Sequence, residues 1–311
     1  MKVNVIILNY NGKDLMKECL PSVVEAAQFS KHNCTVTVLD NKSSDDSTDF
    51  LKKNFSSVKI YEARQNKVYC SYNEIAKTID DDIMIVLNND IKIDKGYIDP
   101  LIEPFLHNED LLFTAPKGYS FDGQRYEGDR SKAAIRWGII EPQVTYKDYE
   151  KDINLPGHAF SAGVGAFDRK KIILLGGYDE IYLPGRYEDV DLCYRGWKRG
   201  WKGLYQPQSM QYHKGGASFK KEYDSQRVSK LVFRNSIIFM VKNVSDFYLL
   251  TKFYIFTALR TILYLIMGRF YMVGGFLSAI KMIPAIIARE NTESRFFILN
   301  DAQVLKKINN N

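Results

Sequence analysis

Ile-Met-Ile-Val-Leu-Asn-Asn-Asp-Ile-Lys-Ile, at residues 83–93, is an apolar run that is interrupted by the polar residues Asn88, Asn89 and Asp90. Its apolar part is typical of a strand that is buried on both faces, as in parallel sheets. Such a strand carries the residues that follow it to the carboxyl edge of the sheet, where open α/β sheets bind ligands. Asp90 is therefore a candidate ligand for a hard cation, because such cations prefer carboxylate oxygen. The alternative is a turn that only ends the strand, for which Asn and Asp are the usual residues.

The chain before this stretch alternates between predicted strands and helices. Strands are predicted at residues 3–8, 35–39 and 58–61, and helices over residues 15–24, after residues 42–47 and over residues 72–78. We expect Pro21 to disturb the first helix, because proline lacks a backbone N–H. Ser44 or Asp45 is expected to cap the second helix. The alternation predicts a doubly wound, mostly parallel α/β sheet.

Polar side chains follow three of these predicted strands, namely Asn9, Asp40 and the group from Asn88 to Asp90. The carboxyl ends of parallel strands meet in one crevice, so these side chains should face a common ligand. The chain has neither a GxGxxG fingerprint after its first strand nor a GxxxxGK[ST] loop. These patterns leave a nucleotide that is held by acidic and amide side chains together with a cation.

An ordered set of motifs resembles family 2 glycosyltransferases with the GT-A fold, in particular bacterial rhamnosyltransferase-like enzymes of surface polysaccharide synthesis. The motifs are VIILNYNG at 5–12, VLDNKSSDDST at 38–48, LNND at 87–90, SAGVGAF at 161–167, GGYDE at 176–180, YEDVDLCYR at 187–195 and YHKGGAS at 212–218. The resemblance implies a GT-A type α/β fold, a doubly wound, mostly parallel sheet with a helical C-terminal extension. It divides the chain into a nucleotide-sugar-binding half at 1–110, an acceptor-binding half with the catalytic base at 111–225, and a helical segment at 226–311 for membrane association or dimerisation.

The resemblance also implies a set of donor-binding residues. They are Asn9, Asp40, Asn66, Asn88, Asn89 and Gly163. Asp40 would bind the nucleotide base or ribose. Gly163 would line the donor or acceptor pocket, although a tight turn between strands also requires glycine.

A site for Mn²⁺ or Mg²⁺ at Asp90 and His213 follows from the same resemblance. The stretch from Asn88 to Asp90 matches the family's Asp-x-Asp motif, but Asn88 leaves Asp90 as its only carboxylate. His213 would be a further ligand, since neutral imidazole binds manganese. A cation there would stabilise the departing nucleotide diphosphate as a Lewis acid. The alternative for a lone histidine such as His213 is a purely structural role.

The resemblance implies that Asp189 is the catalytic base, which removes a proton from the acceptor hydroxyl in an inverting transfer. Glu188 would bind the acceptor or orient Asp189, and Asp191 is a second candidate for the base. An amphipathic helix is predicted at 192–201, directly after these acids. Acidic residues are also favoured at a helix N-terminus by the helix dipole, which is the structural alternative.

The segment from Asn66 to Asn73 departs from the family's usual pattern. Relatives usually have glycines where Val68 and Tyr72 stand, and larger side chains there would crowd a nucleotide. Residues 120–158 are polar, aromatic and poorly periodic. Long loops of this kind are often functional, so we predict an acceptor-facing excursion, with ordinary surface loops as the alternative.

The net charge of +6 is concentrated near the C-terminus, because residues 220–295 carry 12 Lys+Arg against 5 Asp+Glu, or +7, and the other residues sum to −1. Arg260 and Arg269 separate apolar runs, and no charge-free run approaches the roughly 20 residues of a spanning helix. We expect interfacial helices on an anionic membrane surface. The alternative is packing on the catalytic domain or on a second copy in a homodimer. Four cysteines without a CxxC pair indicate a reducing environment, so the predicted location is cytoplasmic, peripheral on the inner face of the cell membrane.

The leading hypothesis is a metal-dependent, inverting hexosyltransferase that moves one sugar from a nucleotide diphosphate sugar to a glycan or lipid-linked acceptor. The chain has no QxxRW-like motif, which favours single addition over polymer synthesis. One alternative is a nucleotidyltransferase that acts on sugar phosphates. Another is a non-catalytic, membrane-associated scaffold with a degenerate donor site. A nucleic acid is not expected as a partner.

Overall fold

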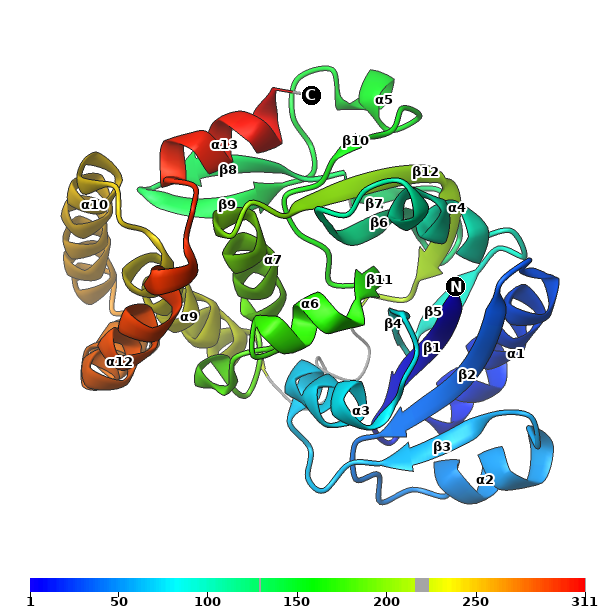
Figure 1. Ribbon diagram of the computed structural model, residues 1–311. Coiled ribbons are helices and arrows are strands. Elements are labelled where there is room, and N and C mark those ends of the chain that lie inside the picture. Colours follow the sequence, from blue (N-terminus) through cyan, green and yellow to red (C-terminus); the bar gives the residue numbers. More distant parts are fainter. Residues whose placement is uncertain (129, 216–223, 311) are drawn as a thin grey trace.

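A large mixed sheet forms the centre of the computed structural model, which describes residues 1–128, 130–215 and 224–310 (Figure 1). The strands are β1 Lys2–Asn9, β2 Asn33–Asp40, β3 Lys59–Glu62, β4 Ile83–Asn88, β5 Ile91–Ile93, β6 Leu111–Ser120, β7 Tyr126–Gly128, β8 Lys132–Arg136, β9 Ile139–Gln143, β10 Gly157–His158, β11 Gly165–Asp168 and β12 Lys202–His213. The order in the large sheet is β10-β12-β6-β11-β4-β1-β2-β3, with β5 paired to β12 and β7 paired to β6. Strands β8 and β9 form a separate hairpin.

Strand β4 is the buried strand that the sequence predicts. Its residues Ile83 to Leu87 are buried, and the chain turns at Asn89 and Asp90 before it continues as β5. Strand β1 pairs in parallel with β4 and β2, and β2 pairs in parallel with β3. The doubly wound, mostly parallel half is thereby confirmed. Strand β11 lies antiparallel between β4 and β6, which makes the whole sheet mixed.

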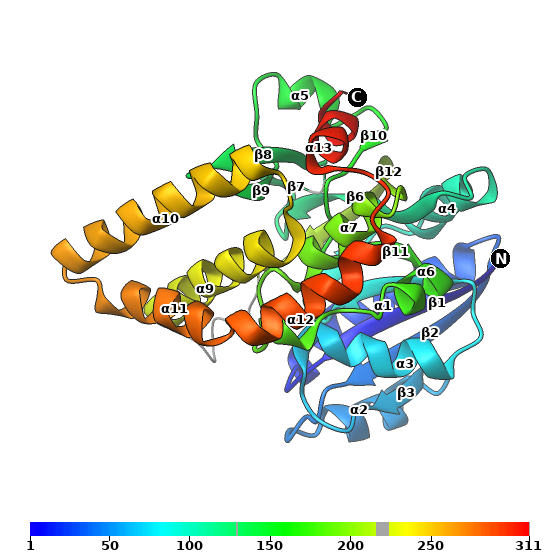
Figure 2. The same ribbon diagram turned by 60° about the vertical axis from the view of Figure 1, so that its left-hand side comes forward.

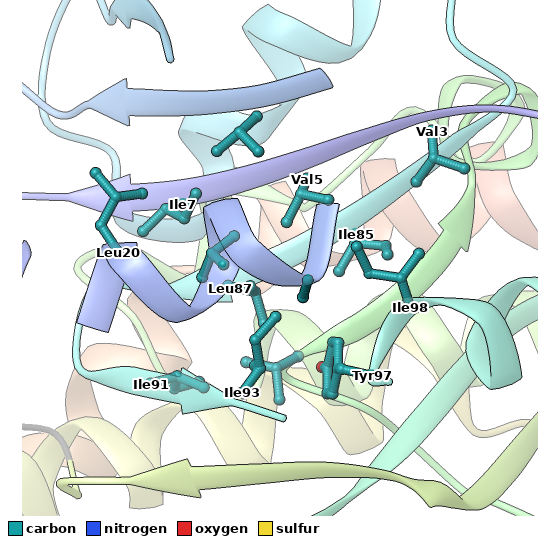
Figure 3. Packing of buried hydrophobic residues seen from close by; sticks show 14 of the residues in the cluster. Val3, Val5, Ile7, Leu20, Ile85, Leu87, Ile91, Ile93, Tyr97 and Ile98 are labelled. Atoms are coloured by element: carbon teal, nitrogen blue, oxygen red, sulfur yellow. The ribbon is translucent and has the colours of Figure 1, made fainter. Parts of the chain in front are cut away.

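Helices cover both faces of this sheet. They are α1 Lys13–Phe29, α2 Ser47–Asn54, α3 Tyr72–Thr78, α4 Ile98–Ile102, α5 Tyr149–Asp152, α6 Arg169–Leu174 and α7 Glu188–Lys198, with 3-10 turns η1 Val68–Ser71, η2 Glu103–Leu106 and η3 Glu180–Tyr182. Helix α1 packs against the apolar side chains of β1 and β4, where Leu20 meets the cluster that contains Val5 and Ile85 (Figure 3).

Two expectations about these helices are wrong in detail. Helix α1 continues through Pro21, which lies on its exposed face. Buried Met16, Leu20 and Val23 anchor α1 on both sides of the proline, so packing outweighs one missing backbone hydrogen bond. The N-cap of α2 is Asp46, one residue after the predicted position.

Residues 120–158 do not form a long loop. They contain β7, the β8–β9 hairpin, α5 and β10, and the turn of the hairpin is Trp137-Gly138. Both turn residues have positive φ, 52° and 75°, as in the two-residue turns that match strand twist. Ile139 and Ile140 are buried against the C-terminal helices. The expectation of a long loop is wrong because short strands in a polar segment leave little periodic signal, whereas the acceptor-facing role stays a prediction.

The C-terminal segment is helical, as expected. Its helices are α9 Ser225–Asn243, α10 Phe247–Ile266, α11 Phe270–Lys281, α12 Ile283–Glu293 and α13 Asp301–Asn309, with the turn η4 Ser294–Phe296. Helices α10 and α11 project from the body and meet at their far ends (Figure 2). A side chain at Gly275 would place its Cβ 2.9 Å from the carbonyl oxygen of Lys230, so α11 lies directly against α9. Helices α9 to α13 share one apolar core with α7 and the β8–β9 hairpin.

By length and composition, helix α10 could cross a membrane, with a mean hydropathy of 1.5 and only 17% of its apolar window buried. Helix α11 and the segment Ile283–Phe296 would pass the same test together, but they are bent by 56°. The observation that no charge-free run approaches the length of a span still holds, but it did not anticipate a helix of this mean hydropathy. Lys252 and Arg260 interrupt the apolar sequence of α10, but its mean hydropathy stays high enough for a membrane-spanning helix.

Candidate active site

A cavity of about 570 Å³ opens where β1, β2 and β4 end. This volume is typical of small-molecule sites. Seven of the residues predicted from the sequence line it, namely Asn66, Asn88, Asn89, Asp90, Glu188, Asp189 and His213. The cavity is also lined by residues that the sequence analysis missed, including Tyr10, Asn41, Tyr69 and Arg186.

Strand pairing brings the two predicted metal ligands together. Strand β5 pairs antiparallel with β12, which places His213 opposite Ile91 and therefore beside Asp90. The distance from His213 Nε2 to Asp90 Oδ1 is 3.3 Å. The backbone N–H of Lys214 also donates to the Asp90 carbonyl at 3.1 Å, which fixes the turn.

This pair fits a divalent cation. His213 Nε2 is buried and has no hydrogen-bond partner of acceptable geometry among the described residues, although it faces the Asp90 carboxylate. Neighbouring ligands of an octahedral ion such as Mg²⁺ lie about 3 Å apart, close to the observed separation. Within the described ranges, no group of three or more His, Cys, Asp or Glu could hold a metal. The remaining ligands would have to come from water and substrate phosphate, as is usual for Mg²⁺.

Glu127 on β7 supports His213 from its other side. Glu127 Oε2 lies 3.2 Å from His213 Nδ1, so it can accept the ring N–H and leave Nε2 directed at Asp90. Burial alone would lower the pKa of His213, but the carboxylates of Asp90 and Glu127 outweigh burial and raise this pKa. No sequence motif points to Glu127, because this residue lies in the segment without motifs.

The predicted catalytic acids occupy the first turn of α7, which begins at Glu188 rather than at residue 192. The two preceding residues, Arg186 and Tyr187, have φ values of 80° and 76°. This left-handed conformation is uncommon outside glycine and often marks functional sites. The amide of Asn235 on α9 holds the turn, with Nδ2 lying 2.7 Å from the Arg186 carbonyl oxygen.

Glu188 is buried, and Asp189 beside it is half-buried. Burial raises the pKa of Glu188 to about 8, with a further contribution from the Asp189 charge. Burial also raises the pKa of Asp189. Glu188 Oε2 has no hydrogen-bond partner among the residues that the structure describes. A Cβ at Gly163 would lie 3.2 Å from Asp189 Oδ2, so glycine leaves space beside this carboxylate.

The raised pKa of Glu188 predicts a pH-dependent stability. Between pH 4.5 and about 8, Glu188 stays protonated in the folded chain but ionises in the unfolded chain. The free energy of unfolding should therefore fall as pH rises through this window, by at most about 1.4 kcal/mol per pH unit from this group. Glu188→Gln removes the titration, so urea unfolding across the same pH range should give a flatter profile for the variant. Parallel profiles for the two proteins would mean that Glu188 is ionised throughout.

Asp191, the second candidate for the base, is fully buried and does not line the cavity. It accepts from Arg195 Nε at 2.7 Å and from Lys242 Nζ at 2.8 Å. These two cations outweigh burial and hold the pKa of Asp191 below its usual value. Lys242 also contacts Asp179 at 2.7 Å, and Asn243 Nδ2 donates to Asp191 at 2.8 Å. Asp191 thus ties α7 to α9 and cannot reach an acceptor.

One residue of the segment without the family's glycines has a backbone conformation that favours glycine. Val68 adopts a φ of 49°, a left-handed conformation that glycine would enter without strain. Val68 lines the cavity, whereas Tyr72 points into the core and donates to the Leu87 carbonyl at 2.9 Å. Tyr69 stacks on Tyr72 and donates to Asn88 Oδ1 at 3.0 Å. Only Val68 of the two departures therefore narrows the cavity.

Asn9, Asp40 and Gly163 do not line the cavity. Asn9 is buried and donates to Asp40 at 3.1 Å, while Asn89 Nδ2 donates to Asn9 Oδ1 at 2.9 Å. This network supports the cavity from behind and orients Asn89. Asn66 accepts from Asn41 Nδ2 at 2.9 Å and from the Val68 N–H at 3.1 Å. The binding roles of these residues stay predictions, and the part of the last motif at 216–218 lies outside the described residues.

Residues 4–173 match the family model described as Glycosyl transferase family 2. No curated protein matches the sequence. Crystal structures with a similar fold include GalNAc-T7 with UDP, GalNAc and Mn²⁺, which has a TM-score of 0.59 and 19% identity over 80% of this chain and 49% of that chain.

The crystal structure of S. aureus TarS also has a similar fold. Its structure gives a TM-score of 0.53 and 14% identity over 81% of this chain and 43% of that chain. TarS 1-349 in complex with UDP gives a TM-score of 0.52 and 15% identity over 81% of this chain and 70% of that chain. This chain spans about half the length of the GalNAc-T7 chain and less than half of the longer TarS chain. At these identities the likeness concerns the fold, and it confirms the GT-A type.

Proposed function

Because the chain belongs to glycosyl transferase family 2, we propose that it moves a single hexosyl residue from a nucleotide diphosphate sugar to an acceptor hydroxyl, with inversion at the anomeric carbon. The observation that carries this proposal is the shared cavity of Asp189 and the turn from Asn88 to Asp90. This cavity contains both a carboxylate that can act on the acceptor and polar groups that can bind the donor. The family membership favours sugar transfer over the nucleotidyltransferase alternative.

Asp189 is the proposed base. Its carboxylate removes the proton of the acceptor hydroxyl while the hydroxyl oxygen forms a bond to the anomeric carbon. The bond from that carbon to the donor phosphate oxygen breaks on the opposite face, and its electron pair leaves with the nucleotide diphosphate. The raised pKa of Asp189 supports this role, because a carboxylate with a pKa nearer the working pH is a stronger base.

The donor is proposed to lie along the turn from Asn88 to Asp90. Tyr69 fixes the Asn88 amide, and Asn9 fixes the Asn89 amide, so both can present hydrogen bonds without reorganisation. Asp90 and His213 would hold Mn²⁺ or Mg²⁺, which supplies Lewis-acid stabilisation of the departing diphosphate. Arg186, in the wall of the cavity beside Glu188, offers a further positive charge to the phosphates.

The acceptor is proposed to be a glycan or lipid-linked glycan of bacterial surface polysaccharide synthesis. This part rests on the resemblance of the ordered motifs to bacterial rhamnosyltransferase-like enzymes. Glu188 is proposed to contact the acceptor, because its protonated carboxyl can donate a hydrogen bond at neutral pH.

A panel of sugar nucleotides tests the proposal. With Mn²⁺ present, we expect slow hydrolysis of one or a few of them, measured as release of nucleoside diphosphate. NMR of the released or transferred sugar should show the inverted anomer. Isothermal titration should show nucleoside diphosphate binding that depends on the metal.

Two outcomes would contradict it. Absence of metal-dependent nucleotide binding would favour the non-catalytic scaffold. Release of pyrophosphate from a nucleoside triphosphate and a sugar phosphate would instead identify a nucleotidyltransferase.

A further inference from the structure

Helix α10 presents an apolar face that nothing in the described structure covers. Its N-terminal half packs on the body through the stripe of Leu249, Phe253 and Thr257. All of its exposed residues except Thr251 are apolar or aromatic. At the far end, 77% of Ile266 is accessible, and at the start of α11 66% of Phe270 is accessible. Soluble monomers rarely expose a continuous apolar surface of this extent.

An exposed tryptophan extends this surface. Trp137, at the turn of the β8–β9 hairpin, is 58% exposed and contacts Phe256 of α10 edge to face at 6.0 Å. A Cβ at Gly138 would lie 2.7 Å from the Phe253 Cα, so the turn rests directly on α10. Trp137 also has a φ of 52°, which is unfavourable for a bulky side chain. Neither burial nor the backbone explains a tryptophan here, whereas tryptophan is enriched at membrane–water interfaces.

The charges on this surface have one sign. Residues 247–281 contain four basic residues, Lys252, Arg260, Arg269 and Lys281, and no Asp or Glu. None of the four forms an ion pair with another described residue. Arg260 stacks instead over the Phe233 ring at 4.9 Å. The surface is therefore both apolar and basic.

This combination decides between the two occupants that could cover the surface. A symmetric contact with a second copy would bring like charges together without any acid from residues 247–281 to neutralise them. An anionic bilayer offers both an apolar interior and negative headgroups. Helix α10 also differs from the core helix of a soluble protein, because only 17% of its 18-residue apolar stretch is buried.

We propose that the α10–α11 hairpin and Trp137 form a docking surface for an anionic lipid bilayer. The apolar side chains enter the boundary between headgroups and acyl chains, and the basic residues bind the headgroups. Helix α11 returns along α9, so the hairpin lies on the bilayer surface while the body stays on one side of it. This inference does not rest on the proposed sugar transfer.

The test is co-sedimentation of the full chain with vesicles of phosphatidylcholine and phosphatidylserine. We expect binding at low salt that weakens at high salt and is much lower with phosphatidylcholine alone. The triple variant Ile262→Ser, Ile266→Ser, Phe270→Ser should lower binding by about tenfold or more. The matched control Leu106→Ser, Leu155→Ser, Leu174→Ser changes three exposed residues elsewhere and should bind normally.

Two further variants and one control separate lipid binding from folding and from charge. Trp137→Asn should lower vesicle binding without unfolding the chain, because asparagine suits the turn better than tryptophan. Arg269→Gln with Lys281→Gln should lower binding to anionic vesicles, and Lys17→Gln with Lys53→Gln should not. Any donor hydrolysis without vesicles should be unchanged in all of these variants.

Three results would overturn the proposal. One is full-length protein that ignores anionic vesicles at low salt. Another is equal binding to neutral and anionic vesicles. The third is a wild-type dimer in sedimentation that the triple variant converts to a monomer, which would show that a second copy covers the surface.

Discussion

Asp189→Asn is expected to bind the sugar nucleotide nearly as tightly as the native chain but to turn over more slowly by a factor of about 10² to 10⁴, the usual contribution of a general base. Asparagine has almost the same shape as aspartate, so the first turn of α7 should stay intact. It cannot take up the acceptor proton. Donor affinity by isothermal titration and kcat at saturating donor separate these two effects.

Asp191→Asn is the matched control for this experiment. It makes the same chemical change two residues away, where the carboxylate is bound to Arg195 and Lys242. Leaving these cations without their buried partner should cost about 3–5 kcal/mol of stability, visible in urea unfolding. Whatever fraction stays folded should keep its turnover. An inactive Asp191→Asn beside an active Asp189→Asn would show that the base is assigned two residues too early.

Asp90→Ala is expected to abolish turnover, because it removes the only carboxylate of the Asp-x-Asp-like motif. Binding of Mn²⁺ in the presence of nucleoside diphosphate, followed by electron paramagnetic resonance of the free ion, should be lost as well. Asp94→Ala is a suitable control, since Asp94 is exposed just beyond β5 and does not line the cavity. Unchanged activity and manganese dependence in Asp90→Ala would refute the metal site.

The neighbours of Asp90 should give a graded series. His213→Ala should weaken manganese dependence less than Asp90→Ala does. Glu127→Gln should have the mildest effect, about 10- to 100-fold in metal affinity, as is typical of a group that orients a ligand. A wild-type manganese response in His213→Ala would mean that His213 is structural.

Most of the donor half could be predicted from the sequence, because its signals are local. The apolar run of β4 and the polar residues at its end lie within 11 consecutive positions. Repeating strands and helices then place Asn88 and Asp90 at the carboxyl edge of the sheet. The family's motifs also pointed to Asp189 and His213. Hydrophobic periodicity could not have shown that either residue lies near Asp90.

Residues that depend on distant pairings escaped the prediction. Glu127 reaches His213 across 86 positions, through the pairing of β7 with β6 and of β6 with β12. Asn235 holds the turn before Glu188 from a helix whose sequence shows only its apolar face. The backbone conformation of Val68 was not foreseen either, although the glycines of relatives at that place point to it.

The buried ion pairs of Asp191 limit how this chain could be recombined with its relatives. Lys242 and Asn243, at the end of α9, are partners of a residue in the first turn of the catalytic helix. A hybrid that took its C-terminal helices from another protein without these two side chains would leave a charge stranded in the interior. Engineers who graft acceptor or membrane specificity onto this scaffold should therefore transfer α7 and α9 as a matched pair. Natural recombination that exchanged α7 without α9, or α9 without α7, would leave the same unpaired charge in the interior.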